Sequence, residues 1–145
     1  MEGMSTIVKK VSQLVAGLIF MYGIYIILHG HLTPGGGFAG GAIVAGAFIL
    51  LILAFGSSAL NLKKEVAGSS NTESVAILLV VILALMSLFL GAKVFFGNFL
   101  PKGEAGTLLS AGVIPLYNIF IGIEVAGAIL TIFLALVIFK EESSK

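Results

Sequence analysis

Hydrophobic residues fall in four long runs along the 145-residue chain, separated by three stretches that are richer in polar residues, glycine or proline. The pattern predicts helices over residues 11–28, 36–60, 75–98 and 113–139. Each is long enough to cross a bilayer, which takes about 20 mainly apolar residues. We therefore expect an all-helical integral membrane protein with four transmembrane helices in one domain, residues 1–145. The polar segments at 63–74 and 98–112 are expected to be loops.

The first apolar run also has to be compared with a secretory signal peptide. It covers residues 11–28, longer than the apolar core of about 7–15 residues that such peptides have. No small-residue cleavage site of the A-x-A type follows it. The run is therefore expected to remain as the first transmembrane helix.

Lysines are distributed unevenly about the predicted helices. Four spans place both termini on one side of the membrane, and the other side would hold Lys102 and, near a helix end, Lys93. Cytoplasmic segments carry an excess of positive charge, so both termini are expected on the cytoplasmic side of the cell membrane. The six lysines on that side would be Lys9, Lys10, Lys63, Lys64, Lys140 and Lys145.

Composition supports a membrane protein and limits its chemistry. Only 10% of residues are charged and the mean hydropathy is +1.17, whereas soluble domains have about 25% charged residues. The absence of cysteine excludes disulfides, thiolate metal sites and cysteine nucleophiles. The net charge of +1 says little about partners, and we expect no cofactor in this chain and no nucleic-acid partner.

The segment HGHLTPGGGFAGG, residues 29–41, interrupts the hydrophobic pattern between the first two predicted helices. Gly35, Gly37 and Gly40 match the G-x-G-x-x-G pattern of dinucleotide-binding folds. In those folds a strand precedes the motif and an acidic residue follows about 20 positions later. Here an apolar helix precedes it and no acidic residue occurs between Glu2 and Glu65. We therefore reject nucleotide binding.

The same glycines suit close packing between membrane helices. Small residues four positions apart, such as Gly36 and Gly40, let another helix backbone approach closely. Proline is tolerated at the first position of a helix, so the second helix is expected to begin near residues 34–37. A flexible segment that lines an ion pathway is the alternative interpretation. The predicted close-packing motif consists of Pro34, Gly35, Gly36, Gly37, Gly40 and Gly41.

His29 and His31 are the only histidines of the chain. They lie two positions apart with no carboxylate nearby, so neither a metal site nor haem ligation is expected. Histidine changes charge near neutral pH, so a titrating pair at the membrane edge is one hypothesis, and hydrogen bonding to the broken backbone is the other. Tyr22, Tyr25 and His29 share one face of the first helix, which fits an interfacial aromatic belt or a proton route.

Glu124 is the single charged residue within the predicted helix 113–139. If that helix begins near Pro115, Glu124 lies about 14 Å along it, near the middle of the bilayer. Charged residues at that depth are usually paired or lie on an ion path. Tyr117, Glu124 and Thr131 recur every seven residues and share a face. Ion handling or an inter-subunit pair is expected for Glu124, with a protonated structural carboxyl as the alternative.

Lys93 lies near the outer end of the predicted third helix. It is expected either to extend its amine to the interface or to pair with Glu124. Apart from the residues that flank each helix, the half of every predicted helix nearer the cytoplasm lacks ionisable groups. Because a proton or sodium antiporter needs a path across the whole membrane, we do not expect this chain to transport ions alone.

The segment HGHLTPGGGFAGG, followed by a long apolar helix, resembles the signature of the MnhB/MrpB family. These proteins are small membrane subunits of multisubunit Mrp-type sodium/proton antiporters, and the module recurs in membrane-bound hydrogenases and related respiratory complexes. The similarity extends to the four-span layout and to IPLYNIFIGIEVAGA at residues 114–128. Antiporter members commonly have a lysine near position 124, and Glu124 departs from that pattern.

The resemblance implies a membrane subunit of an Mrp-type cation/proton antiporter module, freestanding or within a hydrogenase-type complex. It implies partners among other membrane subunits and the lipid bilayer, transport of Na⁺, H⁺ or both, and no enzymatic activity of this chain. A homodimeric transporter that uses Glu124 and a purely structural scaffold are the alternatives. The ion-pathway candidates are Glu124, Lys93, His29, His31 and Tyr117.

Overall fold

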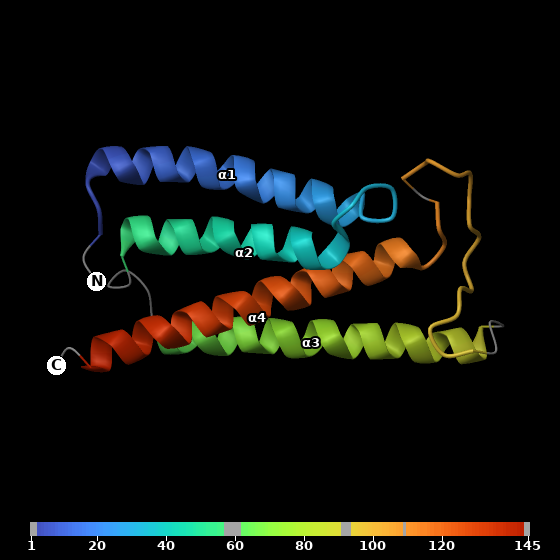
Figure 1. Ribbon diagram of the computed structural model, residues 1–145. Coiled ribbons are helices and arrows are strands. Elements are labelled where there is room, and N and C mark those ends of the chain that lie inside the picture. Colours follow the sequence, from blue (N-terminus) through green and yellow to red (C-terminus); the bar gives the residue numbers. More distant parts are fainter. Residues whose placement is uncertain (1–2, 57–61, 91–93, 109, 144–145) are drawn as a thin grey trace.

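The computed structural model describes residues 3–56, 62–90, 94–108 and 110–143. This part of the chain contains four long helices, α1 (Thr6–Leu28), α2 (Gly36–Phe55), α3 (Leu62–Phe89) and α4 (Ile114–Ser143) (Figure 1). Each is long and apolar enough to cross a membrane. The expected all-helical fold, with four helices that could span a membrane, is confirmed.

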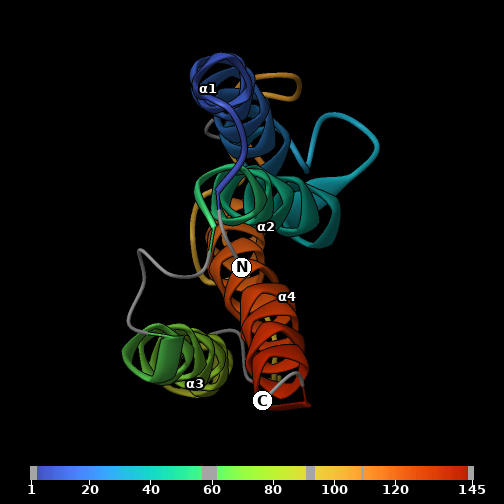
Figure 2. The same cartoon turned by 90° about the vertical axis from the view of Figure 1, so that its left-hand side faces the viewer.

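The four helices form an open, bent row rather than a closed bundle, as the end-on view shows (Figure 2). The order across the row is α1, α2, α4, α3, because α2 packs between α1 and α4, and α3 packs on α4. Successive helices run in opposite directions (Figure 1). We call the end where α1 begins and α4 ends the terminal end, and the end with the α1–α2 turn the turn end. The side of the membrane on which each end lies stays a prediction.

An open row leaves most of each helix uncovered by the rest of the chain. Between 22% and 33% of the most apolar window of each span is buried. The buried residues are mostly small, among them Ala16, Ala45, Ala47 and Ala84. Large apolar side chains cover the outside, as they do in proteins that face lipid or other membrane helices.

The glycines at the start of α2 form the tightest contacts of the row. A Cβ on Gly40 would lie 2.5 Å from Ile27 Cγ1 and 2.8 Å from the carbonyl oxygen of Gly23, both in α1. A Cβ on Gly41 would lie 2.5 Å from the carbonyl oxygen of Gly122 in α4. The α2 backbone therefore touches both neighbours at one level, which only glycine permits.

The turn between α1 and α2 is held by backbone hydrogen bonds to one carbonyl. The backbone N–H groups of Leu32 and Thr33 donate to the carbonyl oxygen of His29 at 2.8 and 2.9 Å, and the Thr33 hydroxyl donates to it at 3.1 Å. Gly35 and Gly36 then adopt φ angles of 134° and 74°. These angles are open to glycine and strained for other residues, which explains the glycines where α2 begins.

Three of the helix boundaries differ from the sequence prediction by four or five residues. α1 begins at Thr6 rather than at residue 11, with the Ser5 hydroxyl accepting a hydrogen bond from Val8 N at 3.5 Å. α2 ends at Phe55 rather than at residue 60, because Gly56 at φ 84° stops the helix. α4 continues to Ser143, since polar residues after the apolar run extend the helix beyond it.

The prediction for the third helix was wrong at both ends. α3 begins at Leu62, so the segment 63–74 is helical rather than a loop, and α3 ends at Phe89 instead of residue 98. The polar segment is helical because Lys64, Glu65 and Ala67 have good helix propensity. Its hydroxyl groups bond back to the helix instead of opening it, as Thr72 Oγ1 does to the carbonyl oxygen of Gly68 at 2.9 Å.

We expect Gly40→Ala to destabilise the protein in detergent by about 1–3 kcal/mol, because the added methyl group would overlap α1. Thermal unfolding of the purified protein measures the effect. Gly46→Ala is the matched control, since a Cβ at Gly46 meets nothing within 4 Å. Equal stability of the two variants would show that the glycine contact does not hold α2 against α1.

Candidate functional site

His29 lies at the C-terminal end of α1, at the turn end of the row. Its ring stacks on Tyr25 with centroids 4.1 Å apart, and Tyr25 stacks in turn on Tyr22 at 6.4 Å. The His29 Nδ1 atom lies 3.1 Å from the carbonyl oxygen of Tyr25. The three aromatic rings therefore form a column along one face of α1 that ends at a partly exposed imidazole.

His31 connects the α1–α2 turn to the segment that precedes α4. Its Nε2 atom lies 3.3 Å from the carbonyl oxygen of Thr107, so that segment passes close to the turn (Figure 1). The other ring nitrogen, Nδ1, is buried and has no hydrogen-bond partner. Because buried polar atoms are normally paired, Nδ1 marks a place for water or for a group from another chain.

Asn118, in the second turn of α4, was missed by the sequence reasoning. Its Oδ1 accepts a hydrogen bond from the backbone N–H of Gly37 at 3.4 Å, and so satisfies a free donor at the start of α2. A Cβ on Gly30 would lie 2.8 Å from Asn118 Nδ2, which is buried and unpaired. The feature of the sequence that could have indicated Asn118 is its amide side chain within the mainly apolar segment IPLYNIF.

Tyr117 lies beside Asn118, with its ring against Phe96 at a centroid distance of 5.4 Å. Its hydroxyl is buried without a hydrogen-bond partner. Tyr117, Asn118 and His31 thus each have an unpaired buried polar atom. Such atoms are usually satisfied by ordered water or a bound group.

The described residues contain no group of three His, Cys, Asp or Glu side chains arranged as metal ligands. His29 and His31 each lie next to a backbone carbonyl oxygen, that of Tyr25 and that of Thr107. The described contacts of the two imidazoles are therefore with backbone carbonyl groups, and their part in an ion pathway stays a prediction.

Glu124 is half-buried in α4, ten residues after Ile114 and therefore about 15 Å along the helix. The spacing of seven residues places it on the same face as Tyr117 and Thr131. Lys93, the expected partner of Glu124, lies outside the described residues. A pair between Lys93 and Glu124 stays a prediction.

Polar groups join α3 to α4 one to two turns beyond Glu124. The hydroxyls of Ser69 and Thr131 lie 2.8 Å apart, and Ser69 is 8% exposed. A Cβ on Gly127 would lie 3.1 Å from the carbonyl oxygen of Ser69 and 3.4 Å from Glu73 Cβ. We use the name polar seam for this contact of Ser69 and Glu73 of α3 with Gly127 and Thr131 of α4, together with Glu124, which lies one turn before Gly127 on α4.

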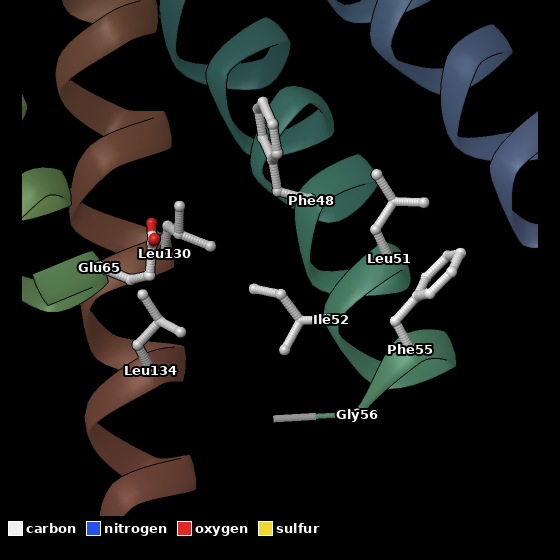
Figure 3. Close-up of a pocket in the computed structure, with 8 residues that line it drawn as sticks. All are labelled: Phe48, Leu51, Ile52, Phe55, Gly56, Glu65, Leu130 and Leu134. Atoms are coloured by element: carbon white, nitrogen blue, oxygen red, sulfur yellow. The ribbon is translucent and has the colours of Figure 1, made fainter. Parts of the chain in front are cut away.

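The predicted loop at 63–74 left Glu65 and Glu73 outside the membrane spans, whereas both lie within α3 and Glu73 packs against Gly127 of α4. In the predicted orientation, the inner half of α3 would therefore contain ionisable groups, contrary to the expectation. Glu65 borders a pocket of about 360 Å³ between α2 and α4 (Figure 3). Its carboxylate lies beside Leu130, among apolar residues that complete the lining: Phe48, Leu51, Ile52, Phe55, Gly56 and Leu134.

A family model described as a domain related to the MnhB subunit of Na⁺/H⁺ antiporter matches residues 7–131. The chain belongs to the MnhB family. The match covers α1, α2, α3 and most of α4, including the glycine contacts and the polar seam. The resemblance seen in the sequence is confirmed.

Relatives of this MnhB-family chain differ in length. A putative antiporter subunit mnhB2 of Staphylococcus haemolyticus is 34% identical over 145 residues, covering 94% of this chain and 96% of the relative. An uncharacterised protein of Methanocaldococcus jannaschii is 33% identical over 130 residues, 86% of this chain but 49% of that protein. This chain therefore spans nearly all of the first relative and about half of the second.

A solved structure shares the fold of this MnhB-family chain. It is a chain of the membrane-bound sulfane sulfur reductase (MBS), an archaeal respiratory membrane complex, with 34% sequence identity and a TM-score of 0.69. The similarity covers 89% of this chain and 56% of the MBS chain. The same four-helix module therefore occurs within a longer chain of a respiratory complex. Together with the four apolar helices, the relatives identify this chain as a multi-pass membrane protein.

The hydrogen bond between Ser69 and Thr131 should appear as an energetic coupling between α3 and α4. We expect a double-mutant cycle with Ser69→Ala and Thr131→Val to give about 0.6 kcal/mol, the average for hydrogen bonds between membrane helices. Unfolding in mixed micelles measures the four variants. The control cycle replaces Ser69→Ala by Thr72→Val, whose hydroxyl bonds within α3, and should give a coupling near zero. Similar couplings in both cycles would contradict the assignment.

Proposed function

We propose that this chain is a membrane subunit of a multisubunit Mrp-type cation/proton antiporter module, either freestanding or part of a larger respiratory membrane complex. The observation that carries the proposal is the MnhB match over residues 7–131, which includes most of the membrane-spanning region. The relatives support both settings, because one is called a putative antiporter subunit and another is a chain of a respiratory complex.

The open row of helices supports a role as a subunit. A path for ions across a bilayer needs polar groups shielded from lipid on all sides. One row has no second layer, and most of its surface is left uncovered. We infer that other membrane subunits cover part of this surface and enclose the polar groups.

Two regions have separate roles in this proposal. The glycine contacts between α1, α2 and α4 hold the row together and seal it. The polar seam between α3 and α4, with Glu124, contributes to the pathway of Na⁺ or H⁺. This chain itself catalyses no chemical reaction and holds no cofactor, and any redox centres of the complex lie on other chains.

The lysine distribution sets the orientation in this proposal. Lys9, Lys10 and Lys64 lie near the terminal end, and Lys140 lies in the last turn of α4. The terminal end would therefore be cytoplasmic, and the turn end with His29 and His31 would face outward.

Purification of the tagged chain from its native membranes in mild detergent tests membership of a complex. We expect it to elute with other antiporter-type membrane subunits in one assembly, identified by mass spectrometry and sizing. Recovery as a homodimer that exchanges Na⁺ for H⁺ in liposomes would instead support the self-sufficient transporter. A purely structural scaffold subunit would need the glycine contacts and no ion-binding side chain. Substitution of Glu124 distinguishes such a scaffold from a subunit that contributes to an ion pathway.

We expect Glu124→Gln to lower cation/proton exchange by about tenfold or more, which corresponds to about 1.4 kcal/mol or more in the limiting step. The reason is that a carboxylate at this depth can carry a proton or a cation, and an amide cannot. Exchange is measured in everted vesicles that contain the assembled complex. The exposed Glu104→Gln is the control. Unchanged exchange with intact assembly would assign Glu124 a structural role only.

A further inference from the structure

Glu73 lies on the face of α3 that packs against α4. The buried residues Ser69 and Ala76 flank it at helical spacing, and Glu73 itself is half-buried. Its Cβ lies 3.4 Å from the position that a Cβ on Gly127 would take. The side chain of Glu73 therefore begins inside the contact between the two helices.

The position of α3 places Glu73 at the level of the middle of α2. The preceding residues Ser69 and Thr72 line one groove of about 360 Å³ together with Val44 and Phe48. Val44 and Phe48 lie about 12 and 18 Å along α2, whose 20 residues span about 30 Å. If α2 crosses the bilayer, Glu73 lies deep within it, where ionisable residues are costly and usually functional.

Glu73 and Glu124 lie close to one another across the α3–α4 contact. Glu124 precedes Gly127 by three residues, so their Cβ positions are about 5–6 Å apart on the helix surface. Adding the 3.4 Å from Gly127 to Glu73 Cβ gives a separation of at most about 9 Å between the two glutamate Cβ atoms. Two glutamate side chains bridge such a separation directly or through one water molecule.

The other titratable groups of the two helices lie farther from this pair. On α4, Tyr117 lies about two turns from Glu124 toward the turn end, and Lys140 lies in the last turn. On α3, Glu65 lies about two turns from Glu73 toward the terminal end. α3 packs mainly on α4, so no other helix brings a charge to Glu73 within the described part of the chain.

We propose that Glu73 relays protons between the terminal end of the row and Glu124, an inference that rests on the proposed antiporter function. In each transfer the O–H bond of protonated Glu73 breaks as an O–H bond forms on the Glu124 carboxylate, directly or through one water. The polar groups of α3 between Glu65 and Glu73 lead from the terminal end to the relay.

The test compares Glu73→Gln, Glu73→Asp, Glu124→Gln and the double variant in the assembled complex, with Glu104→Gln as control. Exchange rate is measured in vesicles as a function of pH, and assembly is checked by purification. We expect Glu73→Gln to lower exchange by about tenfold or more. Glu73→Asp should keep part of the rate with a shifted pH profile, and the double variant should be no slower than the slower single variant, because both residues act in one step.

The outcomes separate this inference from the proposed function. A wild-type exchange rate in Glu73→Gln overturns the relay. If the Glu73→Gln complex does not assemble, an unchanged pH profile of exchange in Glu73→Asp overturns it. Multiplied losses in the double variant would also overturn it, since they would mean independent roles. Recovery of the chain without antiporter subunits would overturn the proposed function instead.

Discussion

The close backbone contact of α2 with both neighbouring helices is the constraint on which the rest of the structure depends. Gly23, Gly40, Gly41 and Gly122 remove the side chains that would separate α1, α2 and α4 at one level. Helices in a bilayer gain little from hydrophobic burial against one another, so packing at van der Waals distance has to hold them together. The left-handed backbone at Gly35 and Gly36 sets the direction in which α2 leaves the turn, and Asn118 then caps it from α4. Three helices are thereby fixed at the turn end, and the position of α4 decides where α3 can bind.

The polar seam depends on that position of α4, but the groups that form it differ in chemistry from the glycine contacts. α3 meets α4 where Gly127 leaves room for the backbone near Ser69 and Glu73, and the hydroxyls of Ser69 and Thr131 close the contact. Polar groups are costly in lipid, and the α3–α4 contact contains several of them, while the tightest contacts between α1 and α2 join glycine and aliphatic residues. The row is therefore divided into a part whose composition suits mechanical packing and a part whose composition suits ion chemistry. The apolar pocket beside Glu65 lies between α2 and α4, at the boundary between these two parts of the row (Figure 3).

The sequence predicted the number of spans and the family, because both depend on features that are local along the chain. Runs of apolar residues define spans whatever their neighbours, and the segment from His29 to Gly41 is unusual enough to identify relatives. The error at residues 63–74 arose because polar composition was equated with a loop, although Lys64 and Glu65 favour helix and the serine and threonine hydroxyls bond to helix carbonyls. With that segment predicted as a loop, Glu73 falls outside the expected membrane spans. Asn118 was missed for another reason, since its role depends on a contact with Gly37 that is 81 residues away in sequence.

The open row also suits a module whose relatives include a putative antiporter subunit and a chain of a respiratory membrane complex. A row offers two broad faces, and what covers them decides which polar groups are reached by water. Glu124 is half-buried by this chain alone, so its surroundings in an assembly depend on the subunit that lies next to α4. The polar first part of α3 carries the same implication: Asn71, Thr72 and Ser74 are exposed on its surface, which suits contact with water or a polar partner better than contact with lipid. In the proposed antiporter module, the open surface of α3 is therefore where we expect a partner subunit to bind.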